Sequence, residues 1–260
     1  MGTNDKVPGF EKREHMAIIT IPGFATDDIA TDAFFCELSE LCAGIEMDED
    51  VRVVIITSPE EKIPFKKKRA KGSLPSNLHG ETSPLSPHPS ESIAGLDRPT
   101  IAAIHGDAFG QGLELAMACD IRIAAESSYF SLPHIHEGLV PQDGGTQRLP
   151  RLVGKGKALE MILTGESIDA REALRIGLVN MVQSSGDVTK KALDLARDMA
   201  TKAPISLRFT REAIYKGMDL TLDQGLRMEG DLYLLLYGTQ DRIHGIESFQ
   251  KKQKPSFQGK

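Results

Sequence analysis

Short apolar runs rich in β-branched residues alternate with stretches of helical periodicity in the first half of the chain. Four of these runs predict buried strands, at residues 17–21, 51–57, 100–104 and 121–125. Residues 27–45 and 112–119 have apolar positions at helical spacing and predict helices between the strands. Strands that alternate with helices favour a parallel sheet with crossover connections, and therefore an α/β fold.

After Asp143 the pattern is almost wholly helical. Five segments have apolar residues at helical spacing: 155–163, 169–176, 189–202, 204–216 and 221–237. We therefore predict an α/β core over residues 1–200 and a helical C-terminal region over residues 201–260. Residues 59–97 are rich in proline and serine. A connection of this length is typical of a functional or mobile loop, and we interpret it as a substrate loop.

Composition excludes several classes of protein. The chain has 260 residues, 40% of them hydrophobic, which is enough to bury the core of one large domain, and its net charge of -6 argues against general nucleic-acid binding. The apolar runs are far shorter than the ~20 residues that cross a bilayer, so no membrane partner is expected. Neither the three cysteines nor any pair of histidines has the spacing of a metal site. Without a disulfide framework or a secretory signal pattern, we expect a cytoplasmic protein.

A glycine-rich turn at residues 105–112 is the first feature that carries chemistry. It has the sequence HGDAFGQG and links the predicted strand 100–104 to the helix that begins near Gly112. Glycines let the backbone approach a ligand, and the N–H groups at a helix start form a partial positive site for an oxyanion. Such turns are also common in purely structural roles, so the turn alone leaves both readings open.

The motifs around this turn resemble, in order and spacing, the enoyl-CoA hydratase/isomerase (crotonase) superfamily. They are RPTIAAI at 98–104, the turn itself, ELAMACD at 114–120, GGTQRLP at 144–150, LTG at 163–165 and GLVN at 177–180. The segment 245–257 is similar to the family's C-terminal tail. The resemblance implies an α/β, crotonase (ClpP-like) fold of repeated β-β-α units with a helical C-terminal trimerisation region. It also implies a homotrimer or a dimer of trimers.

The family's shared mechanism holds a thioester oxygen with two backbone N–H groups and so stabilises an enolate. The resemblance places one of these donors at Gln111. It places the first of the two carboxylates of ordinary hydratases at Glu114, although a glutamate there can also be a capping or core-edge residue. It implies no cofactor other than coenzyme A as part of the substrate.

The position of the second carboxylate is occupied by His134, which departs from the hydratase pattern. A histidine there needs a partner that supports its charge, and Asp143, nine residues on, is the candidate orienting group. This spacing resembles that of 6-oxocamphor hydrolase, a superfamily member that cleaves a cyclic β-diketone, and Glu229 aligns with a further acidic residue of that enzyme. In the alternative interpretation, His134 is a loop histidine and Asp143 caps the following helix.

The loop that normally supplies the first oxyanion donor also departs from the family pattern. Phe65 matches, and Lys67 would supply the backbone N–H, but charged side chains replace small ones at Lys66 to Lys68. The lysines either contact the phosphates of coenzyme A or form a solvated charge run. Phe249 and Lys252 resemble family positions that reach the adenine end of coenzyme A.

Three functions remain open on the sequence alone. The leading hypothesis is an enzyme, a lyase or a C–C bond hydrolase, that adds water to a CoA-thioester substrate through an enolate, either by hydrating a double bond or by opening a ring. The second is a hydrolase of a free cyclic β-diketone that needs no coenzyme A. The third is a non-catalytic binding protein with the crotonase fold.

Overall fold

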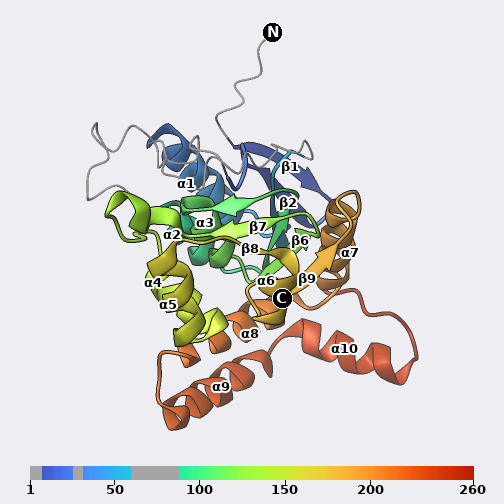
Figure 1. Cartoon of the computed structure of the whole chain (residues 1–260). Coiled ribbons are helices and arrows are strands. Elements are labelled where there is room, and N and C mark those ends of the chain that lie inside the picture. Colours follow the sequence, from blue (N-terminus) through green and yellow to red (C-terminus); the bar gives the residue numbers. More distant parts are fainter. Residues whose placement is uncertain (1–7, 26–31, 60–87) are drawn as a thin grey trace.

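The computed structural model of the chain describes residues 8–25, 32–59 and 88–260 (Figure 1). Its centre is a six-stranded sheet in the order β1-β2-β3-β4-β6-β9. The strands are β1 (Gly9–Arg13), β2 (Met16–Thr20), β3 (Val53–Thr57), β4 (Thr100–Ile104), β6 (Ile121–Ala125) and β9 (Met181–Gln183). All neighbours are parallel except β1 and β2, which form an antiparallel pair at one edge. The parallel arrangement predicted from the alternation of strands and helices is therefore correct for the centre of the sheet.

A second, three-stranded sheet includes part of the glycine turn. It consists of β5 (Ala108–Phe109), β7 (Tyr129–Ser131) and β8 (Ile168–Asp169), with β5 and β7 parallel and β7 and β8 antiparallel. Because β5 lies within the glycine turn and β7 precedes the segment that holds His134, this small sheet places the turn and that segment side by side.

Helices cover both faces of the central sheet, because alternate side chains of each strand point to opposite faces. In β4, Ala102 and Ile104 belong to the larger apolar core, which includes residues of α1 (Asp32–Met47) and α3 (Gln111–Ala118). Ile101 and Ala103 belong to a smaller core, which includes residues of α7 (Val188–Ala200). The remaining helices of this part are α2 (Pro89–Gly95), α4 (Gly145–Val153), α5 (Lys155–Thr164) and α6 (Ala170–Arg175).

Three helices after residue 200 extend away from this body (Figure 1). They are α8 (Pro204–Gly217), α9 (Leu222–Leu236) and α10 (Gln240–Gln250). Arg211 anchors α8 to the body through an ion pair with Asp120 at 3.0 Å, whereas α9 has no buried residue. Among the described residues, no helix is both long and apolar enough to cross a membrane.

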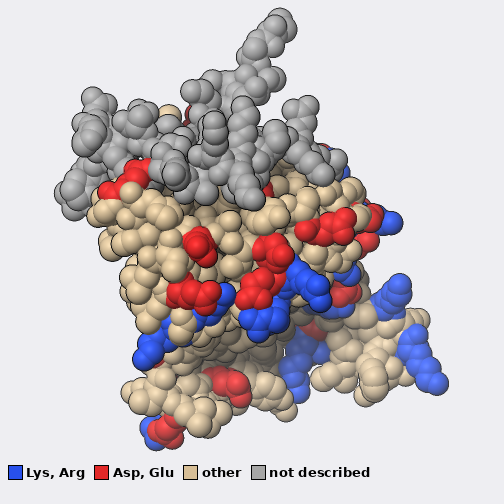
Figure 2. Space-filling model, viewed as in Figure 1, with Lys and Arg blue, Asp and Glu red and all other residues tan. Residues whose placement is uncertain are grey.

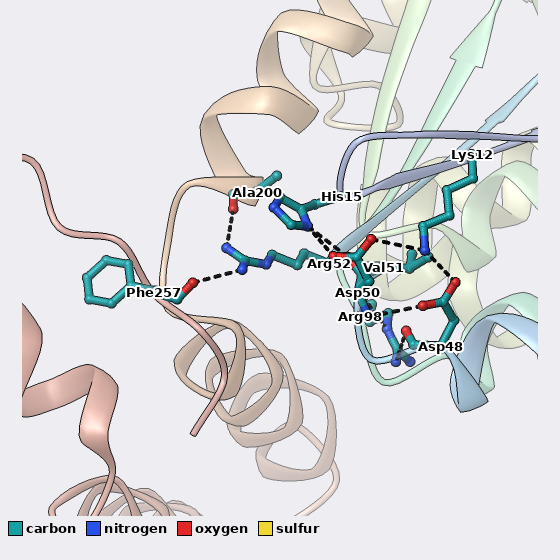
Figure 3. Close-up of polar contacts among 9 residues, drawn as sticks. All are labelled: Lys12, His15, Asp48, Asp50, Val51, Arg52, Arg98, Ala200 and Phe257. Atoms are coloured by element: carbon teal, nitrogen blue, oxygen red, sulfur yellow. Dashed lines mark hydrogen bonds and ion pairs between the residues drawn. The ribbon is translucent and has the colours of Figure 1, made fainter.

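The C-terminal tail returns to the body beside the start of β3 (Figure 3). Arg52 donates hydrogen bonds to the carbonyl oxygens of Ala200 and Phe257, at 3.0 and 2.8 Å. The buried carboxylate of Asp241, in the first turn of α10, accepts from the main-chain N–H groups of Gln258 and Gly259. These bonds hold the C-terminal tail to the start of α10 and to the body beside β3.

Several elements were not predicted, each for a physical reason. All five residues of β1 are exposed, so this strand has no apolar pattern to recognise. The short helix α2 lies inside the segment that we interpreted as a loop, residues 59–97, of which residues 60–87 lie outside the described part of the chain. Two further helices, α4 and α10, also lie outside the predicted segments. The predicted helix 27–45 is described from Asp32, where α1 begins.

Candidate active site

The glycine turn is held in shape by close backbone contacts. The N–H of Phe109 donates to the carbonyl oxygen of Phe24 at 2.9 Å, and the N–H of Gly110 donates to the carbonyl oxygen of Ser131 at 3.0 Å. A Cβ atom on Gly112 would lie 1.8 Å from the Phe24 oxygen, so only glycine fits at this position. The first helical residue is Gln111, and its N–H, like the other N–H groups of a first turn, has no acceptor within the helix. This N–H is therefore available to a ligand oxygen.

Glu114 lies in the first turn of α3, with only 1% of its surface exposed. Its Oε1 atom accepts hydrogen bonds from the main-chain N–H groups of Asp143 and Gly145, both at 2.8 Å. The close approach requires glycine at position 145, because a Cβ there would lie 2.9 Å from Oε1. The Oε2 atom has no hydrogen-bond partner among the described residues. One oxygen of the carboxylate is thus fixed, and the other faces the candidate site.

The environment of Glu114 prepares it for proton transfer. Burial raises the pKa of the Glu114 carboxyl from its ordinary value of 4.5 to about 7. Smaller effects act beside burial. The hydrogen bonds from Gly145 and Asp143 and the charge of Arg148 lower the pKa of Glu114, while the charge of Asp143 raises it. At neutral pH both protonation states are populated, which suits a group that takes and returns a proton.

His134 lies in the 3-10 helix η2 (Pro133–Glu137) and is buried. Its ring lies over Gly110, with Cε1 and Nε2 each 3.9 Å from the position that a Cβ on that glycine would take. Its Nε2 atom is 3.7 Å from Oε2 of Glu114, too far for a direct hydrogen bond. Burial lowers the pKa of the imidazole to about 4, so the ring is neutral at physiological pH. The structure therefore places the predicted site residues Glu114 and His134 next to each other, beside the glycine turn.

Asp143 does not orient His134, and this prediction is wrong for the structure. Its Oδ2 atom accepts from the hydroxyl and the main-chain N–H of Ser90, at 2.8 and 3.2 Å. Its Oδ1 atom lies 3.9 Å from Nδ1 of His88, and within the described part of the chain neither Oδ1 nor Nδ1 of His134 has a hydrogen-bond partner. The physical reason is the unpredicted helix α2, whose first N–H groups need acceptors. Asp143 supplies one to α2 rather than to the following helix.

The other predicted side chains that the structure describes lie on or after the C-terminal helices rather than beside this group. Glu229 is exposed on α9, and Phe249 is exposed on α10. Lys252 follows α10, with a φ of 53°. Four residues lie outside the described part of the chain, and the roles assigned to them stay predictions: Phe65, Lys66, Lys67 and Lys68.

Two contributors to the site, Ser90 and the N–H of Gly145, were not predicted from the sequence. A signal was present for each. Pro89 followed by Ser90 and Glu91 is typical of a helix start, and the Gly144–Gly145 pair indicates a close backbone approach. Among the described residues, no group of three or more His, Cys, Asp or Glu side chains is arranged to hold a metal ion. Glu114 and His134 therefore offer acid-base chemistry next to the N-terminus of α3.

The chain is similar to known proteins both in sequence and in structure. The family model described as enoyl-CoA hydratase/isomerase matches residues 28–260. The crotonyl-CoA hydratase of Syntrophomonas wolfei is 33% identical over 254 residues, which cover 95% of this chain and 96% of that protein. The mitochondrial methylglutaconyl-CoA hydratase of Mus musculus is 38% identical over 232 residues, 85% of this chain and 73% of that protein. The crystal structure of an enoyl-CoA hydratase from Bacillus anthracis superposes with a TM-score of 0.83 at 34% identity, covering 97% of this chain and 99% of that one. The structural match confirms the predicted crotonase fold.

Proposed function

Because the chain belongs to the enoyl-CoA hydratase/isomerase family, we propose that it adds water to the double bond of an enoyl-CoA thioester through an enolate. The observation that supports the proposal is the buried pair formed by Glu114 and His134. Their facing atoms, Oε2 and Nε2, lie 3.7 Å apart at the start of α3, beside the N–H of Gln111, which has no acceptor within the helix. At this separation, a single water molecule can form hydrogen bonds with both groups.

The residues act in sequence. The N–H of Gln111 donates to the thioester oxygen, with the N–H of Lys67 as the second donor in our prediction. Ionised Glu114 takes a proton from water, whose oxygen forms a bond to the β-carbon while the π electrons move to the thioester oxygen. Glu114 then returns the proton to the α-carbon, so that H and OH have added across the double bond. Neutral His134 holds the water in place through Nε2, because a pKa of about 4 makes it a poor carrier of the proton.

Hydration is favoured over the two alternatives by specific contacts. Cleavage of a cyclic β-diketone was inferred from an expected pair of His134 and Asp143, but the Asp143 carboxylate is bonded to Ser90 instead. A non-catalytic binding protein has no need of a buried carboxylate with a free oxygen, which costs stability and is typical of functional sites. Ring opening of a CoA thioester would use the same water-holding pair, and it is the runner-up within this proposal.

The first experiment measures loss of the conjugated enoyl-thioester absorbance of crotonyl-CoA. We expect Glu114→Gln to lower kcat by about 10²- to 10⁴-fold, and His134→Ala by about a hundredfold, as is usual for groups that act on a proton or a bound water. Glu126→Gln serves as the matched control. Glu126 is an exposed glutamate that directly follows β6, so its replacement should leave kcat unchanged. Full turnover by Glu114→Gln would contradict the assignment of the base, and no turnover of any enoyl-CoA by the wild type would contradict the proposal as a whole.

We also propose an oligomeric state and a cellular location for the protein. Large apolar side chains are exposed on the three C-terminal helices, among them Ile214, Leu222, Leu226, Tyr233, Leu234, Leu235, Ile243 and Ile246. Soluble monomers rarely expose so many on one set of elements, so we propose that copies of the chain associate there as a homotrimer or a dimer of trimers. All three cysteines are unpaired, which supports a cytoplasmic location.

A further inference from the structure

We propose that Ser90 and Asp143 are positioning residues for Glu114, with Ser90 holding the Asp143 side chain so that the Asp143 main-chain N–H stays aimed at Oε1 of Glu114. The inference rests on the proposed function, in which Glu114 moves the proton. It assigns a role to Ser90, whose hydroxyl donates to Asp143 rather than to Glu114.

Two sets of hydrogen bonds made by Asp143 connect α2 to α3. Its side chain accepts from the hydroxyl of Ser90 at 2.8 Å and from the Ser90 N–H at 3.2 Å, and its own N–H donates to Glu114 at 2.8 Å. Ser90 is fully buried and Asp143 is 2% exposed, so water does not replace these bonds easily. A displacement of the Asp143 side chain is therefore transmitted to the N–H that fixes Glu114.

The surroundings of Asp143 offer little else to hold it. The segment between η2 and α4 has no regular secondary structure, and Val140 and Gln142 are exposed. Gly144 has a φ of 106°, which bends the chain directly after Asp143. One further bond runs from the Arg148 guanidinium to the Asp143 carbonyl oxygen, at 2.9 Å. Without the Ser90 hydroxyl, the side chain of Asp143 loses the shorter of its two bonds, and the direction of its N–H is less well defined.

Asp143 acts on Glu114 in two opposing ways, and this makes the inference testable. The N–H of Asp143 stabilises the charged form of Glu114, whereas its carboxylate, through negative charge, stabilises the neutral form. The other titratable or charged groups that face the pair in the described structure are His134 from η2, Arg148 from α4, and His88 next to Oδ1 of Asp143. A variant that loosens the N–H and a variant that removes the charge should therefore shift the Glu114 titration in opposite directions.

The experiment compares Ser90→Ala, Ser90→Thr and Asp143→Asn in the full-length protein. The readouts are the pH dependence of kcat/KM with crotonyl-CoA and the titration of the Glu114 carboxyl by NMR of ¹³C-glutamate, assigned through its absence in Glu114→Gln. Ser90→Ala should move the titration to higher pH by about half a unit or more and lower kcat about tenfold, with KM nearly unchanged. Ser90→Thr keeps a hydroxyl and should restore the wild-type profile. Asp143→Asn keeps an acceptor for Ser90 but loses the charge, and should move the titration to lower pH.

Ser128→Ala is the matched control, because Ser128 is also fully buried but lies in the turn before β7, where its hydroxyl has no described partner. It should leave the profile unchanged. A Ser90→Ala profile that matches the control, or shifts of the same sign in Ser90→Ala and Asp143→Asn, would overturn the inference while a large effect of Glu114→Gln kept the proposed function. If Ser90→Ala fails to fold, the Asp143→Asn and Ser90→Thr titrations decide. A wild type without hydratase activity would instead remove the proposed function, and the NMR titration would still report on the positioning.

Discussion

At the scale of single residues, burial moves the pKa values of the two facing groups in opposite directions. The Glu114 carboxyl has a pKa of about 7 and the His134 imidazole a pKa of about 4, because a buried site disfavours the charged form of each. Both side chains are therefore neutral between these values, and only Glu114 changes its charge near neutral pH. In the proposed mechanism, this asymmetry is the reason that Glu114 carries the proton and His134 holds the water.

The raised pKa of Glu114 also predicts a pH-dependent cost in stability. The unfolded chain ionises this carboxyl near its ordinary pKa of 4.5, whereas the folded chain does so near 7, so the unfolded state gains stability as pH rises from about 4.5 through 7. Glu114→Gln removes the ionisation. We expect the variant to be more stable than the wild type by about 1–3 kcal/mol at pH 8, and the difference to vanish near pH 4. Urea unfolding at the two pH values measures it, with Glu126→Gln as the control. A difference that does not depend on pH would contradict the assigned pKa.

At the scale of elements, the glycine turn joins the end of β4 to the start of α3, whose first N–H groups would face a ligand in the proposed function. Gly112 is the residue on which this depends, since its backbone lies against the carbonyl of Phe24 and has no room for a side chain. The same contact sets the direction of the N–H of Gln111 one residue earlier. The proposed oxyanion binding therefore depends on the same backbone contact as the packing at this point.

We predict that Gly112→Ala destabilises the protein by about 1–3 kcal/mol and lowers kcat more than it raises KM. The first effect follows from forcing the backbone of α3 away from Phe24, and the second from moving a donor that acts mainly on the transition state. Thermal unfolding and steady-state kinetics measure the two effects. Gly44→Ala in α1 is the matched control, because nothing lies within 4 Å of a Cβ there, and it should be neutral or stabilising by about 0.5–1 kcal/mol. Wild-type kinetics in Gly112→Ala would show that the turn does not need this contact.

At the scale of the whole molecule, charge and apolar surface are distributed differently. On the face shown in Figure 2, acidic and basic side chains of the described residues lie beside one another rather than in a single basic patch. This agrees with the net charge of -6. The apolar surface is concentrated instead on α8, α9 and α10, which extend from the body.

We predict that a charge on this apolar surface breaks the assembly. The wild type should sediment as a trimer or hexamer at micromolar concentration, and Leu234→Glu, which alters a 66% exposed side chain of α9, should yield mainly monomer because burying an unpaired charge in an apolar interface is costly. Met47→Glu changes an 85% exposed side chain at the end of α1 and should leave the assembly intact. A monomeric wild type would show that the exposed helices serve another purpose.

Local pattern was sufficient for the parts of this protein whose causes are local. The central strands are runs of β-branched residues buried on both faces, and the position of Glu114 one turn into a helix follows from the glycine turn before it. The side-chain partner of Asp143 was decided only by the tertiary structure, since α2 is too short to show periodicity and its need for acceptors becomes visible only where it packs. The separation of His134 from Glu114 likewise depends on how β5 and β7 pair. A sequence determines which groups are available and which face of an element they occupy, whereas contacts between elements determine which of those groups meet, because hydrogen bonds and desolvation depend on distances that only packing sets.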